Sequence, residues 1–169
     1  MTIQTPIRSP FATEYLTQAA LKVTETNASF WVGYSGETIT GAETADFLDA
    51  ARQILEKAGW TRSYVDDDPE MPDLDESMSI KTMLLTLGRY ARQALGRPSA
   101  LTLFSAMLRV DNDDARTIAR RVLDALVAAH TGTPTAQATA WAERTTRTWD
   151  EVRALLEAGT DFARTHGPR

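Results

Sequence analysis

Apolar residues recur three and four positions apart along most of this 169-residue chain, and this spacing most constrains its fold. The clearest stripe, which Gly59 follows directly, consists of Phe47, Leu48, Ala51, Ile54, Leu55 and Ala58. A glycine just after the last apolar position is typical of a helix end. The periodicity predicts a mainly α protein, a single-domain array of six to seven helices.

Several helix starts can also be predicted from the sequence. Ser9-Pro10 suits a first N-cap and first helical residue. Thr40 with Glu43, and Thr148 with Glu151, have the spacing of a capping box. The Thr- and Gly-containing segment 131–135 is the best linker candidate. We therefore expect a main helical domain over residues 1–132, and a C-terminal helical pair over 133–169 that packs on it within the same domain.

Residues 29–40 interrupt the helical pattern. Residues 29–34 are rich in aromatic and β-branched side chains, which favour strands, and Ser35-Gly36 follows as a turn. This predicts a small β-hairpin near residues 29–40. Phe30, Val32 and Tyr34 alternate along one face of this hairpin and Trp31 lies on the other, and one of the two faces is expected to be exposed. An exposed aromatic patch marks a partner site, so Phe30, Trp31 and Tyr34 are candidate partner-binding residues.

An acidic segment separates the second expected helix from the third. Residues 61–76 hold seven acidic side chains and two prolines, which predicts a loop over 65–76. The apolar stripe of the next helix consists of Ile80, Met83, Leu84, Leu87, Ala91 and Ala94. The opposite face of this helix is basic, so the chain changes from acidic to basic within a few turns.

Arginines gather on two of the expected helices. If these helices are neighbours, Arg89, Arg92, Arg116 and Arg120 form an anion-binding surface for nucleic acid or an acidic peptide. The alternative is an ordinary solvated face. Asp113 and Asp124 lie at pairing distance from Arg116 and Arg120, which supports that alternative.

No catalytic residue, metal site or cofactor is predicted. There is no cysteine, which excludes disulfides and thiolate chemistry, and there is no phosphate-binding glycine loop. The two acidic clusters lack the Gly and Glu that a calcium loop needs at its sixth and twelfth positions. His130 and His166 each lie in the last turn of an expected helix, where a cation suits the helix dipole. A general-base role for either histidine stays open.

Location and partners follow from charge and hydropathy. Residues 1–10 lack an apolar core for a signal peptide, and nowhere do eighteen apolar residues follow one another. We therefore expect a cytoplasmic protein without a membrane partner. The net charge of −5 argues against strong non-specific nucleic-acid binding.

The middle of the chain resembles a family of small actinobacterial helical proteins of unknown function. The resemblance lies in residues 50–57 with Gly59-Trp60, in residues 84–88, and in Asn112-Asp113 with residues 115–119. It extends over residues 47–129 and implies a helical fold without an activity. Members of that family often carry a Cys before the glycine-containing helix, and this chain has none.

Three hypotheses about function follow. The first is a non-enzymatic interaction or regulatory protein that acts through a protein partner or as a homo-oligomer. The second is a nucleic-acid-associated protein that uses its basic helix faces. The third is an enzyme without a recognisable sequence signature.

Overall fold

A computed structural model describes residues 11, 14–63, 72, 78–96 and 100–169 of the chain, where it contains seven helices and no strand. The helices are α1 (Glu14–Thr26), α2 (Gly41–Ala58), α3 (Ile80–Gly96), α4 (Leu103–Leu108), α5 (Asp113–Thr131), α6 (Ala138–Ala142) and α7 (Trp149–His166). The prediction of a mainly α array of six to seven helices is confirmed. The predicted helix start at Ser9-Pro10 and most of the acidic loop at 65–76 lie outside the described residues.

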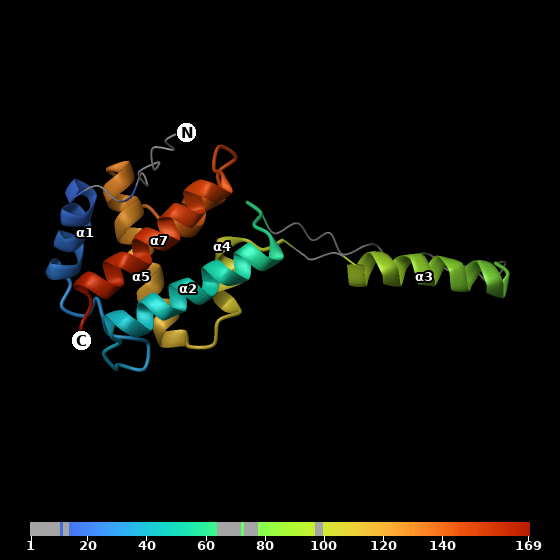
Figure 1. Cartoon of the computed structure of the whole chain (residues 1–169), viewed down its shortest axis with the longest axis horizontal. Coiled ribbons are helices and arrows are strands. Elements are labelled where there is room, and N and C mark those ends of the chain that lie inside the picture. The colour runs from blue at the N-terminus through green and yellow to red at the C-terminus, as the bar shows by residue number, and fades with distance from the viewer. Residues whose placement is uncertain (1–10, 12–13, 64–71, 73–77, 97–99) are drawn as a thin grey trace, which may run out of the picture.

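Six of the seven helices form one packed body, and α3 stands apart from it (Figure 1). The most extensive contact joins α2 to α7, and α5 packs against α1, α2, α6 and α7. Apolar side chains from α2, α5 and α7 meet at the centre of this body. Among those with no exposure at all are Leu48, Ile118, Leu123, Leu155 and Leu156. This core stabilises the fold, because burying each apolar side chain of this size contributes about 1.5–3 kcal/mol of free energy.

Two glycines allow α2, α5 and α7 to approach closely. The Gly41 amide donates to the Pro168 carbonyl at 2.8 Å, and a Cβ on Gly41 would overlap the carbonyl oxygen of Ala163. A Cβ on Gly159 would lie 2.7 Å from the side chain of Leu123 on α5. The N-terminus of α2 and the C-terminus of α7 are therefore fixed against each other by backbone contact.

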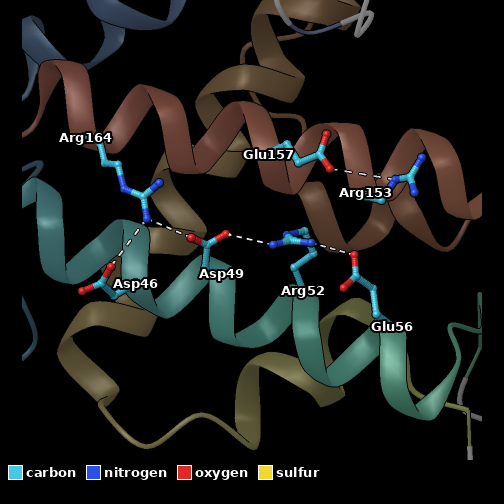
Figure 2. Close-up of polar contacts among 7 residues, drawn as sticks. All are labelled: Asp46, Asp49, Arg52, Glu56, Arg153, Glu157 and Arg164. Atoms are coloured by element: carbon cyan, nitrogen blue, oxygen red, sulfur yellow. Dashed lines mark hydrogen bonds and ion pairs between the residues drawn. The ribbon is translucent and has the colours of Figure 1, made fainter. Parts of the chain in front are cut away.

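Ion pairs run along the seam between α2 and α7 (Figure 2). Arg164 of α7 contacts Asp46 at 3.6 Å and Asp49 at 2.8 Å, and Arg52 bridges Asp49 at 3.4 Å and Glu56 at 2.7 Å. All five side chains are partly exposed, so each pair contributes roughly 0–1 kcal/mol. The seam is therefore held mainly by apolar packing and only aligned by its charges.

Both capping boxes predicted from the sequence are present. The Glu43 amide donates to the Thr40 hydroxyl, and the Glu43 carboxylate accepts from the Thr40 amide at 2.8 Å. Thr148 and Glu151 repeat this arrangement at α7. The hydrogen bonds from Thr40 hold the pKa of Glu43 below its ordinary value of 4.5. Gly59 ends α2 with φ at 87°, in the region that favours glycine.

The prediction of a β-hairpin at 29–40 is wrong. The segment contains a single antiparallel bridge, between Val32 and Thr38, and no strand among its residues, all of which are described. One nitrogen of Arg121, on α5, donates to the carbonyl oxygens of Ser29, Phe30 and Val32 at 2.8–2.9 Å. The residues before Val32 form turns instead of a strand, because the Phe30 amide donates to the Asn27 carbonyl and the Val32 amide donates to the Ser29 carbonyl. The segment is therefore a loop tied to α5.

The C-terminal residues 133–169 contribute α6 and α7, which pack on α5. Helix α7 also covers α2, so these residues complete the central core. None of the described helices combines the length and the apolar character needed to cross a membrane.

Candidate functional site

The chain leaves the helical body and returns to it at one point, with α3 in between. The Leu101 amide donates to the Gly59 carbonyl at 2.9 Å, and the Thr61 amide donates to the Leu101 carbonyl at 3.0 Å. Trp60 thereby forms a parallel bridge with Leu101. The ring of Trp60 lies 6.5 Å from that of Trp149 at the start of α7. Both ends of the segment that carries α3 are thus fixed to the body.

Helix α3 begins at a serine cap and exposes apolar side chains. The Ser79 hydroxyl accepts from the Thr82 amide at 3.3 Å. Ile80 is 78% exposed, Leu84 65% and Leu85 56%, and α3 is absent from the closely packed helix pairs of the body. A helix of this length is marginal in water without packing, because nucleation is costly. An exposed apolar row on such a helix marks an interaction surface.

We call the row formed by Ile80, Leu84, Gly88 and Ala91 the α3 face. Each residue follows the previous one by three or four positions, so the four lie on one side of the helix. All four are exposed, and nothing lies within 4 Å of the position that a Cβ on Gly88 would occupy. The face is therefore bulky in its first half and hollow in its second.

A second surface feature is a groove of about 330 Å³ between α4 and α5. Its lining combines apolar side chains with three arginines. The lining residues are Phe104, Met107, Arg116, Thr117, Arg120, Arg121 and Asp124. We call this the α4–α5 groove; Leu108, one turn along α4 from Phe104, is also exposed.

The charges in the α4–α5 groove are largely paired. Arg116 forms an ion pair with Asp113, and Arg120 lies 3.8 Å from Asp124. Arg121 is engaged with the carbonyl oxygens of the loop at 29–32. The groove therefore offers an incoming anion mainly the exposed guanidinium of Arg120, which is 53% accessible.

Asp124 has a structural role within this groove. Its carboxylate accepts from the Ala138 amide at 2.6 Å, and it caps α6, whose N-cap residue Gln137 makes no side-chain cap. Burial raises the pKa of Asp124 above its ordinary value, and the Ala138 hydrogen bond and the charge of Arg120 offset only part of that effect. The carboxylate thus joins α5 to α6.

The predicted partner-binding aromatics do not form one patch. Phe30 is 3% exposed and belongs to the core, and Trp31 is half-buried with its ring edge-on to Phe30 at 5.3 Å. Tyr34 is 92% exposed. Only Tyr34 is thus fully accessible, because Arg121 fastens the loop with Phe30 facing inward.

The four predicted anion-binding arginines are divided between two places. Arg116 and Arg120 line the α4–α5 groove. Arg89 is exposed on α3, and the side chain of Arg92, also on α3, lies outside the described part of the structure. Since α3 does not pack on α5, only the groove arginines are brought together.

The two histidines contact aromatic rings at helix ends. His130 lies 4.7 Å from Phe11 and 6.4 Å from Trp141, measured between ring centroids, and His166 lies 5.0 Å from Phe162. Within the described residues, no three His, Asp or Glu side chains are grouped to hold a metal ion.

Sequence reasoning missed the two features that organise these surfaces. The anchoring role of Arg121 has no local signal, because its loop partners lie 89–92 positions away. The exposure of α3 has a weak signal in the sequence. Residues 77–110 contain basic residues and no acid, and a glycine interrupts the apolar row at position 88. The absence of acidic residues and the glycine within the apolar row are both unusual for a helix that packs on a protein core.

A protein-family model matches residues 40–162, well over half of the chain, from the cap of α2 into α7. Its description reads family of unknown function (DUF6197). No curated protein and no solved structure matches the chain. The expectation of an uncharacterised family is confirmed, and the family description carries no activity.

Proposed function

Because this chain belongs to that family of unknown function, we propose its role from its own geometry. It is a non-enzymatic interaction or regulatory protein that acts through a protein partner, and α3 is the element that meets the partner. The observation that carries the proposal is the exposed apolar α3 face, with Ile80 at 78% and Leu84 at 65%.

The anchoring of α3 supports this role. The hydrogen bonds between Gly59, Thr61 and Leu101 hold both ends of the segment that carries α3 at one point of the body. Helix-in-groove recognition uses anchors at this three- and four-residue spacing.

The nucleic-acid alternative has less support. Phosphate binding needs several free cations, and two of the groove arginines already contact carboxylates. The third, Arg121, is bound to backbone carbonyls. We therefore place the partner among proteins, and we propose a cytoplasmic setting in an actinobacterial host, in keeping with the arginine-rich composition.

A matched pair of variants tests the role of α3. Leu84→Glu puts a charge in the middle of the α3 face, and Thr82→Glu puts the same charge on the exposed opposite side of the same helix. The tagged protein and both variants are used to capture partners from a host extract, with bound proteins compared by mass spectrometry. We expect Leu84→Glu to lose the bound proteins and Thr82→Glu to retain them.

Circular dichroism of both variants provides the control for folding. The proposal fails if native protein and Leu84→Glu capture the same proteins in equal amount. It fails equally if the native chain stays strictly monomeric and captures nothing.

A further inference from the structure

The α3 face has a shape that fits a second copy of itself. Its bulky side chains, Ile80 and Leu84, lie in the first half, and the open position at Gly88 and the small Ala91 lie in the second. Gly88 costs a helix interior about 1 kcal/mol relative to alanine, and no contact within the described chain accounts for it. A notch next to a knob on one face is self-complementary when the second helix runs in the opposite direction.

We propose that the partner of α3 is α3 of a second copy of this chain, in an antiparallel pair. Leu84 of each copy fills the notch at Gly88 of the other, and Ile80 lies against Ala91. The two-fold axis then passes level with residue 86. This inference rests on the proposed function, because it names the partner of the same surface.

Only the antiparallel direction fills the notch. In a parallel pair Leu84 would face Leu84 and Gly88 would face Gly88, so the notch would stay empty as a void between the two helices. A two-fold contact in which the same patch serves both copies is also the commonest way in which proteins form dimers.

Sedimentation velocity over about a hundredfold range of protein concentration tests the pairing. A helix pair this short buries less than a standard interface, so we expect a concentration-dependent monomer–dimer equilibrium. Gly88→Leu is the decisive variant, because leucine forms helices well yet fills the notch. Overpacking should weaken dimerisation at least about tenfold. General hydrophobic association would instead be strengthened by the added leucine, and that result would overturn the proposal.

Disulfide formation tests the direction of the pair. The native chain has no cysteine, so each introduced thiol is unique. Ile80→Cys and Ala91→Cys chains, one of them lengthened by a tag, are mixed and oxidised. The antiparallel pair predicts the mixed 80–91 disulfide alone, because like positions lie about 15 Å apart or more along the axis, beyond disulfide reach. Homotypic disulfides, or a dimer that forms no disulfide, would contradict this geometry.

The two proposals fail in different ways. A chain that is monomeric at every concentration, but captures host proteins through Leu84, rules out self-pairing and leaves the interaction role intact. A monomeric chain whose capture is indifferent to Leu84→Glu contradicts both.

Discussion

At the scale of single residues, Arg121 joins α5 to the loop that precedes α2 through the carbonyl oxygens of Ser29, Phe30 and Val32. Removal of the guanidinium leaves these acceptors without their donor. We expect Arg121→Ala to lower the free energy of unfolding by about 2 kcal/mol. Urea denaturation measures this loss.

The neighbouring arginine provides the matched control. Arg120 is more exposed and only 3.8 Å from its partner, so Arg120→Ala should change the free energy of unfolding by no more than about 0.5 kcal/mol. Equal losses in the two variants would show that the loop is not held by Arg121.

Asp124 should give the molecule a distinctive pH response. Burial raises its pKa, so the folded protein holds the proton more tightly than the unfolded chain. The resulting contribution to stability is complete below about pH 4 and is lost as the pH rises through the raised pKa. Asp124→Asn, which stays neutral, should therefore gain stability relative to the native chain between about pH 4 and pH 7. Urea denaturation of both proteins at about pH 4 and about pH 7 checks this prediction. A difference in unfolding free energy between variant and native chain that is the same at both pH values would argue against it.

At the scale of elements, the capping box of α7 should be measurable. Thr148→Ala removes the acceptor for the Glu151 amide and should lower the free energy of unfolding by about 1 kcal/mol at neutral pH. Burial would raise the pKa of Glu151, but hydrogen bonds from Thr148 and Arg147 outweigh it and hold the pKa below 4.5. The contribution is thus present above about pH 5 and lost as the pH falls.

Thermal denaturation at several pH values follows the effect of Thr148→Ala. Thr146→Ala, at an exposed position two residues earlier, is the control and should be nearly neutral. Equal losses in both variants would mean that the box adds nothing, and a loss that does not shrink in acid would contradict the contribution of the Glu151 carboxylate.

The sequence was sufficient for elements whose signals are local. The stripes of α2, α5 and α7, the boxes at Thr40 and Thr148, and the glycine after α2 all act within a few residues. The loop at 29–40 could not be predicted in the same way. Its aromatic residues favour a strand locally, but the loop is fixed by hydrogen bonds from Arg121, which comes from a distant helix.

The candidate site was predictable only in part. The apolar stripe of α3 was evident, yet a stripe that packs on a core and one that awaits a partner follow the same period. Whether the stripe packs on the core or faces solvent depends on where the helix lies in the tertiary structure. The pairing of Arg116 with Asp113 and of Arg120 with Asp124 follows from helical spacing and was predictable. The hydrogen bonds from Arg121 to backbone carbonyls depend on the approach of the loop at 29–32 and were not.

At the scale of the whole molecule, the body should fold without α3. The amide of Leu101 lies 2.9 Å from the carbonyl oxygen of Gly59, so a short Gly/Ser linker in place of residues 64–99 can join the two ends. Shortening a loop changes its closure entropy only slowly with length. We expect the free energy of unfolding to change by about 1 kcal/mol or less, while partner capture is lost. A chain that no longer folds would show that α3 belongs to the core.

Hydrogen exchange of the α3 amides tests the central claim most directly, with α5 as the internal reference. In dilute protein, α3 should exchange far faster than α5, because its apolar face lacks a partner. On concentration of the protein, or on addition of the captured partner, α3 should become protected while α5 stays unchanged. If α3 is already as protected as α5 in dilute solution, its face is covered by its own body, and the claim that α3 awaits a partner is wrong.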